Sequence, residues 1–178
     1  DIGASTGGFT DVLLRAGARR VYAIDVGYGQ LDWKLRNDPR VTVMERTNAR
    51  YLTPSDFPEP PTLGVMDVSF ISVKTVLPAV CSCLREEARL VLLIKPQFEA
   101  EKALVGKGGI VRDPQVHRAV LEDVLGFLPT IGLTPLGLTV SPIKGMDGNT
   151  EFLLLAGWRT KEPAVVPDLA GVLEIAWK

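Results

Sequence analysis

Apolar and polar positions alternate along this chain in a way that predicts strands and helices following one another from the first residues onward. Apolar residues at helical spacing predict helices over residues 8–16, 31–36, 73–84 and 114–128. Compact apolar runs predict strands over residues 21–25, 41–44, 63–67, 90–94, 136–140 and 151–156. This alternation is typical of an α/β fold with a mostly parallel sheet and helices on both faces. The loop between the last two strands contains no helix, so we expect one antiparallel strand to close the sheet.

The length of the chain, 178 residues, suits one compact domain with a sizeable core. Asp1 already lies in what reads as a loop after a strand, so we expect the first strand region of the domain to lie upstream. We place the domain over residues 1–158 and a tail over residues 159–178, where residues 169–176 have the pattern of a short helix. No apolar run approaches the ~20 residues that span a bilayer. We therefore expect a cytoplasmic protein without membrane contact.

A glycine-rich segment opens the chain and leads into the first predicted helix. Gly3, Gly7 and Gly8 allow a tight turn and a close approach of the backbone to a ligand, and Asp25 ends the next strand. A carboxylate at that position can accept hydrogen bonds from both hydroxyls of a ribose. The spacing Gly-x-x-x-Gly-Gly differs from the dinucleotide fingerprint, and the opening acid Asp1 suits a ligand with an amino group and a sulfonium. A turn that needs small residues for structure alone is the alternative.

Six short motifs resemble, in order, those of the TlyA family of FtsJ-like ribosomal RNA methyltransferases, often called hemolysin A. They cover residues 1–10, 25–31, 45–50, 67–72, 95–99 and 148–151. The resemblance implies a Rossmann-like S-adenosylmethionine methyltransferase fold with a mostly parallel seven-stranded sheet and one antiparallel strand. It also implies 2′-O-methylation of ribose in ribosomal RNA, with an RNA-binding domain upstream that makes most of the contacts to ribosomal RNA or ribosomal subunits. The implied cofactor is S-adenosylmethionine, bound by Asp1, Gly3, Ala4, Ser5, Gly7, Gly8, Asp25, Val26, Asn48, Ala49 and Asp67.

Three charged residues are candidates for catalysis. Asp67, Lys95 and Glu151 each lie at or just past the carboxyl end of a predicted strand, which places them on the rim of the cofactor loop. FtsJ-like enzymes use a Lys-Asp-Lys-Glu tetrad, and the resemblance assigns its last three members to these positions. Its first lysine is expected upstream of residue 1, so this chain alone is expected to be inactive or impaired. We predict Lys95 as the base, oriented by the two carboxylates. Charged residues that merely cap strand ends are the alternative.

Charge and rare residues restrict the remaining candidates. The net charge of −1 gives no support for RNA binding by the domain as a whole. Basic residues in and near the loops are candidate phosphate contacts, although a solvated loop would look the same: Lys102, Lys107, Arg112 and Lys144. Cys81 and Cys83 have neither disulfide nor metal spacing, and His117 has no second histidine or acid cluster. We therefore expect no metal.

Three other functions compete with RNA methylation. A membrane-active toxin would fit the hemolysin label, but the sequence has no strongly basic amphipathic helix. A cofactor-binding domain without catalysis would fit the truncated start, although Asp67, Lys95 and Glu151 argue against it for a longer protein. An NAD-dependent oxidoreductase is disfavoured by the glycine spacing.

Overall fold

The computed structural model describes residues 1–145 and 148–177, and strands and helices alternate from residue 8 to residue 94, whereas the last two strands follow one another without a helix between them. Positions 146 and 147 of the predicted loop and position 178 of the predicted tail lie outside the described residues. The strands are β1 (Val21–Ile24), β2 (Val41–Met44), β3 (Leu63–Met66), β4 (Arg89–Ile94), β5 (Leu133–Val140) and β6 (Phe152–Trp158). The α-helices are α1 (Gly8–Arg15), α2 (Trp33–Arg36), α3 (Val73–Cys83), α4 (Pro96–Glu99), α5 (Pro114–Phe127) and α6 (Leu169–Ala176).

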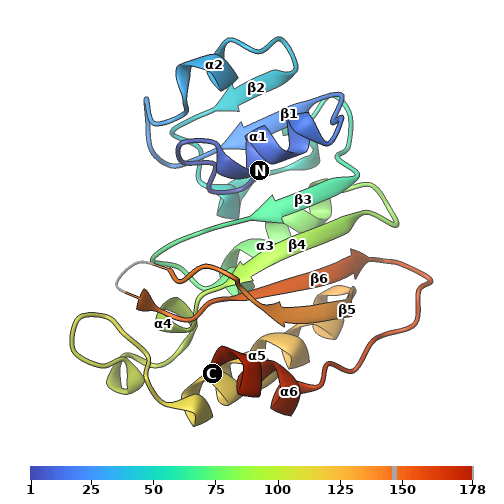
Figure 1. Ribbon diagram of the computed structural model, residues 1–178. Helices are drawn as coiled ribbons and strands as arrows, with labels where there is room; N and C mark the ends of the chain where they lie inside the picture. Colours follow the sequence, from blue (N-terminus) through green and yellow to red (C-terminus); the bar gives the residue numbers. More distant parts are fainter. Residues whose placement is uncertain (146–147, 178) are drawn as a thin grey trace.

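All strands belong to one twisted sheet, shown edge to edge in Figure 1. β1 pairs with β2 in parallel, and β3, β4, β6 and β5 follow one another in that order. Ile2 joins the two parts, because it forms parallel bridges to both Ile24 and Met66. The described residues therefore contain six regular strands rather than the expected seven, with Ile2 in the position of a further central strand.

The antiparallel strand lies inside the sheet and not at its edge. β6 pairs antiparallel with β4 on one side and with β5 on the other, so β5 forms the edge. β5 begins three residues earlier than predicted, at Leu133, and its pairing is irregular between Pro135 and Gly137. Proline lacks the N–H that a central strand needs, and an edge strand tolerates it. Because Pro135 and Gly137 are uncommon in strands, the sequence pattern did not predict the first residues of β5.

Helices cover both faces of the sheet. Tyr22 and Ile24 of β1 pack into the larger core, whereas Ala23 between them packs into a smaller cluster with Ala4 and Leu31. Figure 1 shows α1 in front of the sheet and α3 behind it. The buried residues of α3 belong to the larger core, together with residues of α5, β4 and β6. Both layers therefore shield strands that are apolar along their length.

The tail forms a helix that packs on the domain. α6 contacts β5 and α5, and its Leu173 is buried in the larger core. Within the described residues, no helix is long and apolar enough to cross a membrane.

Candidate functional site

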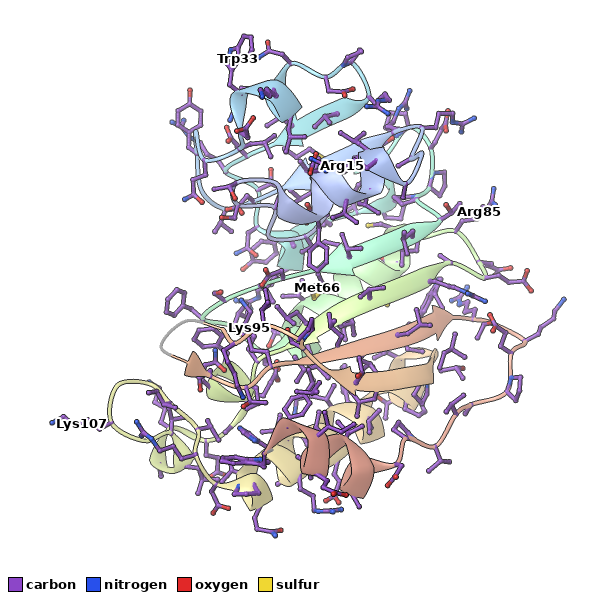
Figure 2. The ribbon with its side chains drawn as sticks, in the orientation of Figure 1. Arg15, Trp33, Met66, Arg85, Lys95 and Lys107 are labelled. Atoms are coloured by element: carbon purple, nitrogen blue, oxygen red, sulfur yellow. The ribbon has the colours of Figure 1, made fainter. Side chains whose placement is uncertain are left out.

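A cavity of about 410 Å³ opens at the edge of the sheet where the parallel strands end. The arrowheads of β1 to β4 point to this edge in Figure 1, and Lys95 lies there in Figure 2. Loops that follow these strands provide much of the lining, which includes Gly3, Ser5, Asp25, Asn48, Asp67 and Phe70. Ligands of open α/β sheets bind at this edge, because strand ends there give way to loops.

The glycine-rich loop reaches this cavity through a backbone that only glycine adopts easily. Gly3 has a φ of +81°, and a Cβ at this position would lie 2.1 Å from the carbonyl oxygen of Asp67. The loop also fixes the carboxylate of Asp25, which accepts hydrogen bonds from the N–H groups of Ser5 (2.8 Å) and Gly27 (2.7 Å). A rigid carboxylate is thereby held at the end of β1, facing the cavity.

The residues expected to bind the cofactor fall into two groups. Seven of them line the cavity: Gly3, Ser5, Asp25, Val26, Asn48, Ala49 and Asp67. Four are not among the lining residues. Asp1 accepts a hydrogen bond from Thr10 Oγ1 at 2.7 Å, and Ala4 packs in the smaller core. Gly7 caps α1 with a φ of +102° beside Leu35, and Gly8 begins the helix. Their roles are to shape the loop and to start the helix.

The donor and acceptor groups of the cavity fit a nucleoside. Asp25 can accept hydrogen bonds from ribose hydroxyls, and Gly3 leaves room beside the backbone of Asp67. Apolar groups of Ile24, Val26, Ala49 and Ile71 complete the walls. A mostly apolar cavity with a few fixed polar groups is the usual form of a small-molecule site. Sequence reasoning did not identify Gln30 and Thr47, which also line it.

Lys95 and Asp67 form an ion pair next to the cavity. Nζ of Lys95 lies 2.6 Å from Oδ1 of Asp67 and donates a hydrogen bond to Ser69 Oγ at 2.9 Å. The Lys95 side chain is only 12% exposed, because it follows the buried strand β4. Two partners and the loss of solvent fix the amino group in one place. Ser69 was not identified from the sequence, although it lies two residues after Asp67.

Glu151 lies at the same end of the sheet as Lys95, but it precedes a strand instead of following one. It precedes β6, whose amino end lies at this edge because β6 is antiparallel, so the expectation that it follows a strand was wrong. The Glu151 side chain is buried and accepts a hydrogen bond from Gln97 Nε2 at 3.3 Å. Burial raises the pKa of Glu151, and Asp67 adds to this, while Lys95 and Gln97 oppose it. The three predicted catalytic residues therefore form one electrostatically coupled group.

Two aromatic side chains lie above this group. Phe70 is 86% exposed and adopts a φ of +64°, which is uncommon for a bulky residue. Its ring centroid lies 5.0 Å from that of Phe98, and Nζ of Lys95 is 6.0 Å from the Phe98 ring. A strained, exposed phenylalanine beside a reactive group is a candidate contact for a flat ligand. The signal was present in the motif of residues 67–72 but was not interpreted.

Three of the four predicted RNA contacts lie in the largely exposed segment between α4 and α5, and the fourth, Lys144, precedes β6. Lys102, Lys107 and Arg112 are exposed, and Figure 2 shows Lys107 pointing away from the sheet. Nζ of Lys144 donates a hydrogen bond to Thr150 Oγ1 at 2.7 Å, next to Glu151. Across the described part of the chain, no group of three His, Cys, Asp or Glu side chains is arranged to hold a metal ion.

The strand order and the position of the cavity are those of the Rossmann-like fold of methyltransferases. A solved structure from Listeria monocytogenes, titled as an S-adenosylmethionine-dependent methyltransferase, superposes with a TM-score of 0.64 at 14% identity over 90% of each chain. The chain belongs to the FtsJ-like methyltransferase family, whose model matches residues 1–158.

Relatives with much higher identity support this membership. The chain is 53% identical to the 16S/23S rRNA (cytidine-2′-O)-methyltransferase TlyA of Mycobacterium tuberculosis, over 86% of this chain and 58% of that protein. It is 48% identical to hemolysin A of Brachyspira hyodysenteriae, over 86% of this chain and 64% of that one. A solved structure from Lactococcus lactis, titled as a hemolysin, superposes with a TM-score of 0.95 at 46% identity, covering 100% and 86% of the two chains. The chain thus spans about three fifths of these curated relatives.

Proposed function

We propose that the protein containing this domain uses S-adenosylmethionine to methylate ribose 2′-hydroxyl groups of ribosomal RNA. The observation that carries the proposal is the ion pair of the largely buried Lys95 with Asp67, with Glu151 beside it, at the mouth of a nucleoside-sized cavity. The name of the Mycobacterium tuberculosis relative gives the same reaction.

The cofactor would occupy the cavity between the glycine-rich loop and Asp67. S-adenosylmethionine supplies an electrophilic methyl group on a sulfonium. Asp25 would accept hydrogen bonds from the ribose of the cofactor, and Asn48 and Ala49 would border its base. Gly3 would let the methionine part pass close to the backbone of Asp67. Asp67, which lines the cavity and pairs with Lys95, would bring the amine close to the bound cofactor.

Lys95 would act as the base for the target hydroxyl. A ribose hydroxyl is a weak acid, so its proton must leave as the new C–O bond forms. The neutral amine of Lys95 would accept that proton, so that the hydroxyl oxygen could take up the methyl group that the cofactor would supply. The resulting ammonium pairs with Asp67 at 2.6 Å, as observed. Glu151 adds negative charge to the same group and completes its orientation.

The pair of the exposed Phe70 and the partly buried Phe98 supports a nucleotide as the target. Phe70 and Phe98 lie beside Lys95, where the base of the target nucleotide could stack while its sugar meets the amine. Enzymes that modify a nucleotide commonly take it out of the base stack and hold its base against aromatic side chains. Because one such surface fits any base, this feature supports RNA without selecting a nucleotide.

Two substitutions of Lys95 test the mechanism in the full-length protein, with ribosomal subunits as substrate. Lys95→Ala removes the base, and Lys95→Arg keeps the charge but cannot lose its proton near neutral pH. We expect both to lower the methylation rate by about 10²–10⁴-fold, the usual contribution of a general base. Lys161→Ala, in an exposed pair with Glu87, is the control and should leave the rate unchanged.

Calorimetric titration separates binding from chemistry. We expect S-adenosylmethionine to bind the wild type and both Lys95 variants with similar affinity, and NADH to bind none of them. An active Lys95→Arg enzyme would rule out the base role while leaving the reaction in place. A full-length wild type that binds the cofactor but methylates no ribosomal RNA would refute the proposed function.

A further inference from the structure

Two loops beside the cavity carry an exposed row of arginines and tyrosines, which we call the arginine–tyrosine ridge. It consists of Tyr28, in the loop after β1, and Arg46, Arg50 and Tyr51, in the segment after β2. The tyrosines are 68% and 72% exposed, although large aromatic residues are usually well buried. The ridge follows the same edge of the sheet as the candidate site.

Each arginine of the ridge lies against a tyrosine ring. Cζ of Arg46 is 4.3 Å from the ring centroid of Tyr28, and Cζ of Arg50 is 5.6 Å from that of Tyr51. Stacking of this kind holds the guanidinium plane while its N–H donors continue to face solvent. The ridge therefore presents flat surfaces and hydrogen-bond donors together.

The two arginines are free of acidic partners, unlike most others in the chain. Arg15, Arg19, Arg36, Arg40, Arg89, Arg118 and Arg159 all form salt bridges. Within residues 1–145 and 148–177, Arg46 and Arg50 form none. Of the three acids in residues 28–51, Glu45 and Asp38 pair with Arg36 and Arg40, and Asp32 caps α2 by accepting a hydrogen bond from the N–H of Lys34. Positive charge is thus concentrated here in a chain whose net charge is −1.

The backbone under the ridge is held firmly in place. Arg46 adopts a φ of +53°, and its N–H donates to the carbonyl of Gly27 at 3.0 Å. Glu45 Oε1 accepts a hydrogen bond from Gly29 N–H at 2.8 Å, which ties the Tyr28 loop to the Arg46 turn. The uncommon backbone conformation of Arg46 is held by these hydrogen bonds, and it fixes the direction of the Arg46 side chain.

The ridge is connected directly to the cofactor cavity. Asn48 lines the cavity, and its Oδ1 accepts a hydrogen bond from the backbone N–H of Arg50 at 3.1 Å. Val26 and Thr47, the neighbours of the ridge in both loops, also line the cavity. A strand that entered the site at Lys95 could therefore continue along the ridge.

We propose that the arginine–tyrosine ridge binds the ribosomal RNA strand that flanks the target nucleotide. The inference rests on the proposed function and adds a contact surface to it. Guanidinium groups bind phosphates through paired N–H donors, and the tyrosine rings stack with unpaired bases. Together they match single-stranded RNA, whose recognition combines phosphate contacts with stacking. The ridge would also reconcile RNA binding with the net charge of −1, because a local positive surface can bind phosphates even when the domain as a whole is not basic.

Binding of full-length protein to ribosomal subunits over a series of salt concentrations tests the ridge. The variants are Arg46→Ala, Arg50→Ala and the double variant, with Arg46→Lys to separate charge from stacking. Arg85→Ala is the control, because Figure 2 shows Arg85 at the opposite end of the sheet from Lys95. Circular dichroism and the unfolding midpoint of each variant show whether it folds like the wild type.

We expect the double variant to bind subunits roughly 10- to 100-fold more weakly, with a log–log salt slope smaller by about 1 to 2. Its affinity for S-adenosylmethionine should equal that of the wild type. Equal weakening by Arg85→Ala, or an unchanged salt slope, would overturn the inference. If the wild type binds and methylates subunits and the folded ridge variants bind them equally well, RNA binding by the ridge is refuted while the proposed function stands. A wild type that binds no ribosomal RNA refutes the ridge and the proposed function together.

Discussion

Glu151 has room for its carboxylate only because residue 145 has no side chain. A Cβ at Gly145 would lie 2.0 Å from Oε1 and 2.4 Å from Cδ of Glu151. The Glu151 carboxylate interacts with Lys95 and accepts a hydrogen bond from Gln97. The Gly145→Ala substitution should therefore push this carboxylate away from Lys95 and Gln97. We expect methylation to fall by about 10-fold or more, because a displacement of about 1 Å is costly in a preorganised site. The measurement is the single-turnover rate at saturating cofactor.

Gly126→Ala is the matched control for this substitution. Gly126 lies in α5, and a Cβ there would have no atom within 4 Å. Alanine is a better helix former, so we expect an unchanged rate and a gain in unfolding free energy of up to about 1 kcal/mol. If Gly145→Ala methylates as fast as Gly126→Ala, the close approach to Glu151 has no catalytic importance.

Residue types at strand ends identified much of the candidate site from the sequence alone. Asp25, Asp67 and Lys95 follow apolar runs, and this pattern places them on one edge of a parallel sheet. The contributions of Ser69 and Gln97 arise from loop geometry, which no periodicity encodes. Asp1 is not among the lining residues, and its carboxylate accepts a hydrogen bond from Thr10, so its role in cofactor binding stays a prediction.

At the scale of elements, a single carboxylate joins the loops that follow β3 and β4. Glu99 ends α4 and accepts hydrogen bonds from Ser72 Oγ (2.5 Å) and from the N–H of Val73 (2.7 Å), the first residue of α3. Glu99→Ala leaves the helix start without this acceptor, so we expect a loss of about 1–2 kcal/mol in the free energy of unfolding. Urea unfolding at neutral pH measures it.

The same carboxylate predicts a pH dependence. Burial raises the pKa of Glu99 above its usual 4.5, although Ser72 and Val73 oppose this. The extra stability that this raised pKa gives the protonated form is therefore complete below pH 4.5 and is lost as the pH rises through the folded-state pKa, whereas the hydrogen bonds to Ser72 and Val73 persist at neutral pH. Glu99→Gln removes the titration, so its unfolding free energy relative to the wild type should increase over that range. If the unfolding free energies of the wild type and Glu99→Gln change in parallel from pH 4 to 7, the pKa of Glu99 is not raised in the folded state.

Helices and strands were predictable because each has a buried face of the right period. The bounds of α3, α5, β2 and β4 agree with the predicted ranges to within one residue at each end. The short helices at Pro96–Glu99 (α4) and Lys102–Leu104 were not predicted, since a single turn has no period to detect. The insertion of β6 between β4 and β5 depends on long-range pairing, which the order of elements along the chain leaves open.

At the scale of the whole molecule, the sheet brings distant parts of the chain to one edge. The cofactor candidates come from the first 67 residues, and Lys95 and Glu151 come from the part that carries the antiparallel strand. Ile2 is the link between the two parts of the sheet, so the site depends on its bridges to Ile24 and Met66. The RNA-binding domain and the first tetrad lysine expected upstream remain predictions.

The carboxy-terminal helix is attached to the domain through His117 of α5. Its ring is fully buried between Phe152 (5.6 Å between centroids) and Trp177 (5.4 Å), the residue that caps α6. Burial lowers the pKa of His117, and Lys144 adds to this, whereas the backbone of Val111 and the charge of Asp113 oppose it. A protonated ring would have to be accommodated between two aromatic groups, so its charging should loosen α6.

The sign of this effect follows from the lowered pKa. The stabilising contribution of neutral His117 is complete above pH 6.5 and is lost as the pH falls through the folded-state pKa. Thermal unfolding midpoints of the wild type should therefore drop below pH 6.5 relative to those of His117→Leu, which cannot titrate. Limited proteolysis of the segment 159–177 should likewise speed up at pH 5.5 in the wild type but not in the variant. If both proteins lose stability and protection in parallel as the pH falls, His117 does not hold the tail, and the attachment of α6 rests on the apolar contacts of Leu173.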